Sequence, residues 1–139
     1  MKRSCSCWLE LVACVILYKD DSLFNFKFLL IQREDGKWAI PGGIGASELT
    51  KNLYDFAAFE CNYDTNFYPL STELKEFRTI LSSCGRKITV FFSCKIEKYD
   101  IELKGKWFSL EDIIAMDKKG EIAFNNAEII KEFILGRKN

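Results

Sequence analysis

The sequence predicts a mixed α/β fold in which a β-sheet lies between helices on both of its faces. Apolar runs of strand length and helical patterns follow one another in the order strands, helix, strands and two helices. The pattern changes at Pro41-Gly42-Gly43, because proline cannot donate to a β-ladder and glycine frees the backbone. Of the 139 residues, 48% are hydrophobic and 29% charged, which is typical of a globular protein with a core. We therefore expect residues 1–139 to form a single domain.

The first predicted strand runs from Trp8 to Tyr18 and is mostly apolar, as expected for a strand buried on both faces. The same stretch also has features of a bacterial lipoprotein signal, because Lys2-Arg3 precede it and Cys14 could be the lipidated cysteine. Glu10 interrupts the apolar run, however, and the run continues past Cys14, whereas a signal peptide needs an uninterrupted apolar centre. We interpret the stretch as a core strand and expect Cys14 to carry no lipid.

Two further strands are predicted before the glycines. A turn at Asp20-Asp21-Ser22 leads into a strand over Phe26 to Gln32, which ends at a hairpin-type turn, Glu34-Asp35-Gly36. A short strand over Trp38 to Ile40 follows and ends at Pro41. The chain therefore reaches the two glycines directly from a strand.

A helical pattern follows the glycines. It begins at Ser47, which is a suitable N-cap, and extends to Asp64. One side of this helix carries Leu49, Leu53, Phe56, Ala57 and Glu60. Because this side is mostly apolar, we expect it to point inward, so that the helix lies across the sheet.

Three more strands are predicted in the second half of the chain. Glu73 to Ser82 and Lys87 to Lys98 form an antiparallel pair around the turn Cys84-Gly85-Arg86, and Lys106 to Phe108 is a short strand. Two helices follow these strands. The first opens at Ser109-Leu110-Glu111-Asp112, which has capping-box spacing.

The last helix is capped by Asn125-Asn126-Ala127-Glu128 and is expected to end at Gly136. Its apolar residues are Ile129, Ile130, Phe133 and Ile134. With this helix, the predicted order of elements is complete, and it places helices on both faces of the sheet.

The composition excludes several kinds of chemistry. The chain has no histidine, so acid–base and metal chemistry that depends on histidine is excluded. Lysine plus arginine equals aspartate plus glutamate, at 20 each, so no overall basic field attracts double-stranded nucleic acid. No stretch approaches the length of a membrane span, and we expect no membrane partner. Six cysteines without paired C-x-x-C spacing favour reduced, mostly buried thiols in a cytoplasmic protein over a structural zinc site.

Glu60 and Asp64 are the strongest candidates for a functional site. Their spacing of four places both carboxylates on one helix face, where like charges repel by about 0.2–0.5 kcal/mol even when exposed. A divalent cation removes this repulsion, and Mg²⁺ prefers one or two carboxylates together with water and substrate phosphates. The alternative is that each acid pairs with a lysine or arginine, or lies at a frayed helix end.

The order of these features resembles the Nudix (MutT-like) family, whose sequence box is G-x5-E-x7-R-E-U-x-E-E-x-G-U. The entry to the box is similar to Leu29-Leu30-Ile31-Gln32-Arg33 followed by Trp38-Ala39-Ile40-Pro41-Gly42-Gly43. The exit is similar to residues 57–67, and Lys106 to Asp112 is similar to a late segment of the family. The resemblance spans nearly the whole chain and implies a Nudix-type α/β/α sandwich with a mixed β-sheet between helices.

The chain departs from the box inside the helix. The segment from Gly43 to Glu60 is two residues longer than in the family, so the first box glutamate falls on Lys51, Leu49 or Glu48, depending on where the gap is placed. The box arginine becomes Phe59, the paired glutamates become Tyr63 and Asp64, and the box glycine becomes Asn66. Asn66 is a mild change, because asparagine tolerates the left-handed conformation that ends a helix.

The resemblance implies a Nudix hydrolase, a pyrophosphatase that uses Mg²⁺ or Mn²⁺ to hydrolyse a phosphoanhydride bond. The ligand would be of nucleotide type, such as a nucleoside triphosphate or ADP-ribose. Glu60 would be the catalytic residue and the best metal ligand, with Asp64, Glu48 and the Gly43 carbonyl as further ligands. The implied substrate-binding residues are Arg33, Trp38, Gly42 and Gly43. The alternative is a catalytically inactive Nudix-fold module for nucleotide binding or regulation, because the box arginine and one acid are replaced.

Overall fold

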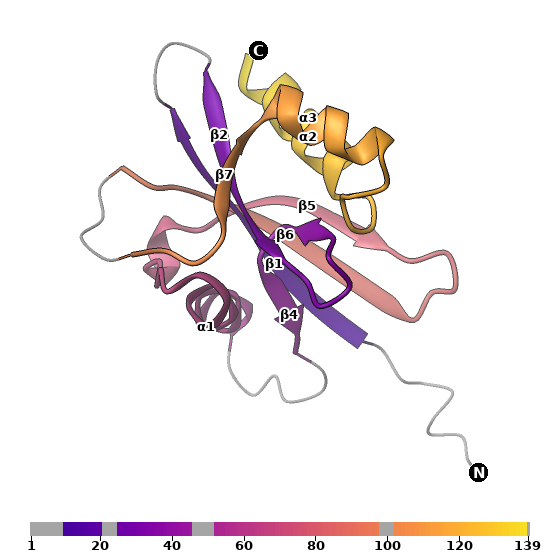
Figure 1. The fold of residues 1–139 in the computed structure, drawn as a ribbon. Coiled ribbons are helices and arrows are strands. Elements are labelled where there is room, and N and C mark those ends of the chain that lie inside the picture. Colours follow the sequence, from indigo (N-terminus) through magenta and orange to yellow (C-terminus); the bar gives the residue numbers. More distant parts are fainter. Residues whose placement is uncertain (1–9, 21–24, 46–51, 98–101, 139) are drawn as a thin grey trace.

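The computed structural model describes residues 10–20, 25–45, 52–97 and 102–138. In chain order the elements are β1 (Glu10–Asp20), β2 (Phe26–Gln32), β3 (Trp38–Ala39), β4 (Gly42–Ile44), α1 (Leu53–Thr65), the 3₁₀ turn η2 (Ser71–Glu73), β5 (Lys75–Leu81), β6 (Lys87–Lys95), β7 (Lys106–Ser109), α2 (Leu110–Lys118) and α3 (Asn126–Lys138). Figure 1 shows a sheet with α1 on one face and α2 and α3 on the other. The predicted α/β/α sandwich is therefore confirmed.

Strand β1 is at the centre of the sheet. The described strands form a seven-stranded sheet with the order β3-β2-β1-β6-β5, in which β4 also pairs with β1 and β7 with β2. On one side, β1 pairs with β6 in parallel, from the pair Glu10–Lys87 to the pair Tyr18–Lys95. On its other side, β1 pairs in antiparallel fashion with β2 near Tyr18 and with β4 near Ala13. The sheet is therefore mixed, as predicted.

The two faces of β1 belong to two separate parts of the core, because successive side chains in a strand point to opposite faces. Ala13, Val15 and Leu17 lie in a buried cluster with residues of α1. Ile16 and Tyr18 lie in a second cluster with residues of α2 and α3. The alternation places α1 behind one face of β1 and the C-terminal helices behind the other (Figure 1).

The start of α1 corrects the sequence prediction. The helix begins at Leu53, because Asn52 is an extended N-cap whose side chain accepts a hydrogen bond from the Asp55 backbone N–H. The expected N-cap, Ser47, lies outside the described residues, as do Leu49 and Lys51. The extended backbone at Asn52 rules out a continuous helix from Ser47.

The end of α1 confirms an expectation, whereas the end of α3 corrects one. Asn66 is the C-cap of α1, with a left-handed φ of 72°, and its N–H donates to the Asn62 carbonyl. Gly136 does not end α3, which continues to Lys138. A glycine ends a helix only where the chain adopts a left-handed conformation there, and Gly136 keeps the helical one.

The short strand β4 was not predicted. Gly42 and Gly43 pair with β1, and this pairing is flanked by hydrogen bonds from the Val15 N–H to the Pro41 carbonyl and from the Gly45 N–H to the Leu11 carbonyl. A Cβ on Gly42 would lie 2.8 Å from the Cys14 Cα, so only glycine allows this close approach of the two strands.

The remaining expectations are confirmed where the structure describes them. The hairpin turns, the β5–β6 pair, β7 and the capping box at Ser109 and Asp112 are present, although β5 begins at Lys75 and β6 ends at Lys95. A turn was also expected at residues 20–22. Asp20 is the last residue of β1, and residues 21 and 22 lie outside the described residues. No described helix has the length and apolar character that a membrane crossing requires.

The cysteines in the described segments are free thiols. Cys61 and Cys94 are buried, Cys14 is half-buried and Cys84 is exposed, and none of them forms a disulfide. This state agrees with the expected reduced thiols. Cys14 lies inside β1, as expected for a core strand.

Candidate functional site

The carboxylates of Glu60 and Asp64 lie against the glycine strand β4. The Gly42 N–H donates a hydrogen bond of 2.9 Å to Asp64 Oδ2. A Cβ on Gly43 would overlap the Glu60 carboxylate, at 2.7 Å from its Cδ. The two glycines therefore allow the α1 carboxylates to approach the strand backbone directly. The sequence predicted all four residues as site residues, and the structure brings them together.

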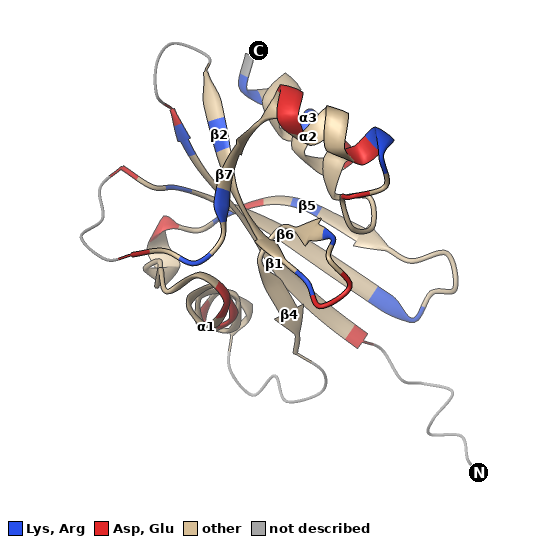
Figure 2. Cartoon of the chain, viewed as in Figure 1, with Lys and Arg blue, Asp and Glu red and all other residues tan. Residues whose placement is uncertain are grey.

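Folding makes both carboxylates harder to ionise. Burial raises the pKa of Glu60 above its ordinary value, and the nearby Asp64 charge raises it further. Burial also raises the pKa of Asp64, although the Gly42 N–H and the positive charge of Lys104 act in the opposite direction. Helix α1 carries acidic residues and no lysine or arginine (Figure 2). Its carboxylates therefore have no basic neighbour within their own helix.

The alternative that each acid pairs with a basic side chain is not supported by the described contacts. Among the described side chains, neither Glu60 nor Asp64 forms an ion pair within 4.0 Å. The Lys104 ammonium donates instead to the Tyr63 carbonyl, at 2.8 Å. Lys104 and Asp64 both line an open hollow of about 610 Å³ on this side of α1. Asp64 is therefore within reach of a ligand from solvent.

These carboxylates suit a divalent cation, which is attracted to two adjacent acids that are costly to ionise. The described residues contain no group of three or more histidine, cysteine, aspartate or glutamate side chains arranged to hold a metal. The third predicted acid, Glu48, lies outside the described residues. The described part of the site consequently contains two adjacent carboxylates, those of Glu60 and Asp64.

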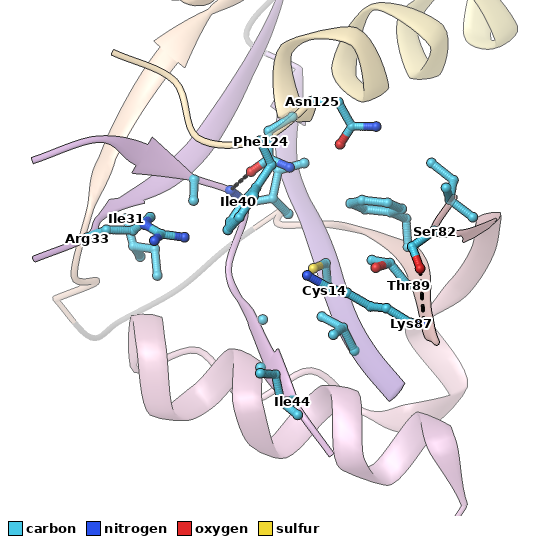
Figure 3. A pocket seen from close by; sticks show the side chains of 17 residues that line it. Cys14, Ile31, Arg33, Ile40, Ile44, Ser82, Lys87, Thr89, Phe124 and Asn125 are labelled. Atoms are coloured by element: carbon cyan, nitrogen blue, oxygen red, sulfur yellow. Dashed lines mark hydrogen bonds between the residues drawn. The ribbon is translucent and has the colours of Figure 1, made fainter. Parts of the chain in front are cut away.

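A cavity of about 630 Å³ lies on the opposite face of the sheet (Figure 3). Gly42 and Gly43 line this cavity and also contact the acidic pair, so the glycine strand separates the cavity from the carboxylates. The walls are largely apolar, and include Val12, Ile31, Ile40, Ile80 and Phe91. No acidic residue is among the described residues that line it.

Two cations and an exposed aromatic ring lie at this cavity. Phe124 is 68% exposed and has a positive φ of 53°, which is uncommon for a bulky residue. The Arg33 guanidinium lies 4.6 Å from the Phe124 ring centroid, and the Lys87 ammonium lies 5.4 Å from it. Arg33 also pairs with Asp35 at 3.3 Å. Of the predicted substrate-binding side chains, only that of Arg33 lines the cavity.

Trp38 occupies a different position. Its ring packs edge-on against Phe108, with 5.1 Å between centroids, and it contributes to the core cluster below α2 and α3. It does not line the cavity beside the glycines. Stacking of a ligand on Trp38 stays a prediction.

The sequence did not indicate Lys87, Phe124 or Asn126 as site residues. Asn126 is buried, and its Oδ1 accepts a 3.0 Å hydrogen bond from the Ile40 N–H, 86 residues away. Each of the three lies at the end of an element or in a loop, and no motif for binding or catalysis surrounds it. The position of Lys87 beside Phe124 at the cavity becomes visible only when the sheet is assembled.

Among the comparisons with known proteins, the one with solved structures supports the fold. No family model matches the sequence, and no curated protein matches it. The Nudix domain of Shewanella oneidensis NrtR in complex with ADP ribose is similar, with a TM-score of 0.73 and 19% identity over 99% of this chain and 94% of that one. The Caenorhabditis elegans Ap4A hydrolase is also similar, with a TM-score of 0.65 and 20% identity over 90% of this chain and 96% of that one.

A third similar structure is a domain in complex with another protein. The C-terminal domain of mouse MUTYH, in complex with human PCNA, has a TM-score of 0.71 and 13% identity over 94% of this chain and 90% of that one. Solved structures with this architecture therefore include a hydrolase, an ADP-ribose-bound domain and a domain bound to another protein. The mixed sheet, the glycine strand and the helix that crosses it show that this chain has the Nudix fold.

Proposed function

We propose that this protein binds a nucleotide-type ligand and hydrolyses a phosphoanhydride bond in it, in a reaction that requires a divalent metal ion. The observation that carries the proposal is the position of Glu60 and Asp64, both with raised pKa values, against the backbone of Gly42 and Gly43. Two adjacent carboxylates that are costly to ionise are a favourable place for Mg²⁺ or Mn²⁺.

Each residue of the site has a distinct role in this proposal. Glu60 is the principal metal ligand and Asp64 the second, held in place by the Gly42 N–H. The Gly43 carbonyl and Glu48 are proposed as further ligands. When bound, the metal ion acts as a Lewis acid and as a template for phosphate oxygens and water. Arg33 extends from the end of β2 to the cavity, where its positive charge attracts phosphate.

The similar structures support the ligand class. The NrtR Nudix domain binds ADP ribose, and the nematode enzyme is an Ap4A hydrolase. ADP ribose and Ap4A both contain phosphoanhydride bonds attached to an adenosine. For this chain we propose the same class, and the apolar cavity next to the glycine strand gives such a ligand a place for its ring system.

A second candidate function is that of an inactive module that binds nucleotides or regulates a partner. At the positions of the box arginine and the first paired glutamate stand Phe59 and Tyr63, which are 55% and 70% exposed and supply no charge. Asp64 already accepts a backbone hydrogen bond, which restrains its carboxylate even without metal. The complex of the MUTYH domain with PCNA shows that a domain of similar architecture takes part in protein recognition.

Hydrolysis assays separate the two functions. The purified protein is tested on nucleoside triphosphates, ADP-ribose, dinucleoside polyphosphates and capped RNA, with Mg²⁺, with Mn²⁺ and with chelator. We expect weak, metal-dependent hydrolysis that falls about a hundredfold or more in Glu60→Gln, because that change removes a ligand that stabilises transition-state charge. Glu121→Gln is the matched control, since Glu121 is exposed and lies far along the chain from α1.

The stability of the variants decides how a loss of activity is interpreted. Glutamine and glutamate are almost equal in size, so Glu60→Gln should leave the free energy of unfolding unchanged or slightly higher. Strong destabilisation would identify Glu60 as a structural partner and favour the inactive module. A wild-type protein that is inert on all four substrate classes with either metal would favour the same conclusion.

A further inference from the structure

The segment just before β7 passes the end of α1 and is bonded to it (Figure 1). The Lys104 backbone N–H donates a hydrogen bond of 2.9 Å to the Thr65 carbonyl, and the Lys104 ammonium donates one of 2.8 Å to the Tyr63 carbonyl. Both carbonyls belong to the last turn of the helix, where carbonyl groups have no partner within the helix itself. Lys104 therefore bonds to the backbone on both sides of Asp64.

The surroundings of Lys104 fix its position. The next residue, Gly105, has a positive φ of 99°, and a Cβ there would lie 2.5 Å from the Leu30 carbonyl oxygen on β2. Only glycine allows this close approach to the strand. On the other side, Thr65 is buried, and its hydroxyl donates to the Cys61 carbonyl. Lys104 is thus held between β2 and the last turn of α1.

Asp64 is consequently restrained at both of its ends. Its carboxylate accepts a hydrogen bond of 2.9 Å from the Gly42 N–H, and its backbone lies between the two carbonyls that Lys104 bonds. A metal ligand needs a fixed orientation, and residues that bond to the ligand commonly provide it. Lys104 is in a position to do so from the end of α1.

The charge of Lys104 makes its role testable. Lys104 and Asp64 line the same open hollow, and the ammonium acts against the burial that raises the pKa of Asp64. A positive charge this close repels a divalent cation at Asp64, so its electrostatic effect alone would weaken metal binding. A lysine that positions Asp64 would strengthen metal binding instead. The two roles predict opposite effects when the ammonium is removed.

We propose that Lys104 is a positioning residue for Asp64. Its two hydrogen bonds to the last turn of α1 keep the Asp64 carboxylate against the Gly42 N–H, in an orientation suited to a divalent metal ion. The use of Asp64 as a metal ligand rests on the proposed function, whereas the positioning is a property of the protein without metal. Lys104 is a cation and does not itself bind the metal.

Titration calorimetry with Mn²⁺ tests the effect on the metal. Lys104→Met removes the ammonium and keeps a long side chain, so it should weaken Mn²⁺ binding by about tenfold or more, as expected when a metal ligand loses the residue that orients it. Lys104→Arg can still donate to the Tyr63 carbonyl and should keep the affinity within about threefold of the wild type. Unchanged or stronger binding in Lys104→Met, or no rescue by arginine, would overturn the proposal.

Amide hydrogen exchange in chelator tests the positioning without metal. The Gly42 N–H is bonded to Asp64, so Lys104→Met should increase its exchange rate by about tenfold or more, and Lys104→Arg should not. The Val15 N–H, which is bonded to the Pro41 carbonyl, is the internal reference and should exchange as in the wild type. Faster exchange at both amides would show a general loosening of β4 and would overturn the proposal.

Lys106→Met is the matched control. Lys106 is exposed, two residues further along the chain, and does not line the hollow. Its ammonium lies 5.9 Å from the Trp38 ring centroid instead. Its replacement removes the same charge and should change the Mn²⁺ affinity and the Gly42 exchange rate by less than about twofold, because exposed charges are screened by salt. Equal effects of the two methionine variants would overturn the proposal.

The two measurements separate this proposal from the proposed function. A wild-type protein that binds no Mn²⁺, but in which Gly42 exchange depends on Lys104, would reject the proposed metal-dependent hydrolysis and leave the positioning of Asp64 standing. Mn²⁺ binding and metal-dependent hydrolysis that are both unchanged in Lys104→Met would reject this inference alone.

Discussion

Individual residues determine how the acidic pair and the glycine strand fit together. Glu60 and Asp64 are one helical turn apart, and the absence of side chains at Gly42 and Gly43 lets both carboxylates approach the strand. The two glycines have different surroundings, although they are adjacent. Gly42 faces the backbone of β1, whereas Gly43 faces the movable Glu60 side chain. Substitutions of Gly42 and Gly43 should therefore change the stability of the fold to different extents.

The first prediction concerns these two glycines. In Gly42→Ala the new methyl group would overlap backbone atoms of Ala13 and Cys14, so we expect a loss of about 1–3 kcal/mol of unfolding free energy. In Gly43→Ala it would meet only the carboxylate end of Glu60, which can rotate away, so we expect a loss below about 1 kcal/mol. Urea unfolding measures both. Equal losses of unfolding free energy in the two variants would show that the different surroundings of the two glycines do not affect stability.

The second prediction concerns the pH dependence of stability without metal. Glu60 has an ordinary pKa of 4.5 that rises on folding, so above that value the folded state binds more protons than the unfolded state. The Glu60 contribution therefore becomes less favourable as pH rises from the ordinary pKa through the raised one. Glu60→Gln removes this contribution, so its stability relative to wild type should increase across that window.

The measurement is urea unfolding of the wild type and Glu60→Gln in chelator, at intervals between about pH 4 and pH 7. Using the difference between two proteins cancels the titration of carboxylates that do not interact with Glu60, such as Asp35, whose pKa is lowered by the Lys37 backbone N–H. A difference that is constant with pH would show that Glu60 ionises equally easily in both states.

At the scale of elements, the site depends on contacts between segments that are distant in sequence. Strand β4 is bonded to β1 by backbone hydrogen bonds and to α1 through Asp64. Ile40, two residues before β4, is bonded to α3 through the buried side chain of Asn126. The short segment between β3 and β4 is thus held by elements from three different parts of the chain.

The third prediction concerns this link to α3. Asn126→Ala leaves the buried Ile40 N–H without an acceptor, which should cost about 1–3 kcal/mol of unfolding free energy. Asn126→Asp keeps an acceptor oxygen and should recover part of the loss. Asn125→Ala is the control, because Asn125 is exposed and its side chain makes no hydrogen bond within the described part. Similar stability of the two alanine variants would contradict the prediction.

Element boundaries show the limit of local patterns. Ser47 and Asn52 are both of a type that caps helices, and apolar periodicity continues across the segment between them. The structure selects Asn52, whose side chain bonds to the Asp55 N–H. Gly136 is equally ambiguous, because a glycine ends a helix only if tertiary contacts favour a left-handed conformation. The local sequence pattern therefore decides neither where α1 begins nor where α3 ends.

At the scale of the whole molecule, the sheet separates the acidic pair from the apolar cavity. The acidic pair lies with α1 on one face, and the cavity with Lys87 and Phe124 lies on the other. Only the glycine strand is shared by both. A metal at the acids would therefore connect α1 with the sheet and should stabilise the folded state as a whole, because the unfolded chain does not hold the two carboxylates together.

The fourth prediction follows from this linkage. Mn²⁺ at about a hundred times its dissociation constant should raise the free energy of unfolding by about 2.7 kcal/mol, and chelator should reverse the effect. Thermal unfolding at increasing Mn²⁺ concentrations measures this shift. Glu60→Gln should show a much smaller shift, whereas the control Glu121→Gln should behave as the wild type does. An equal shift in all three proteins would place the metal elsewhere.

The sequence by itself determined the order of the helices and of the strands other than β4, and the acidic pair on α1, because apolar periodicity, caps, turns and i,i+4 spacing are local properties. Only the tertiary structure decided that the glycines form a strand on β1, that Asn126 holds Ile40, and that Lys87 meets Phe124 in one cavity. The physical reason is that these contacts join residues tens of positions apart, and a residue's neighbours across the sheet leave no pattern in its own segment.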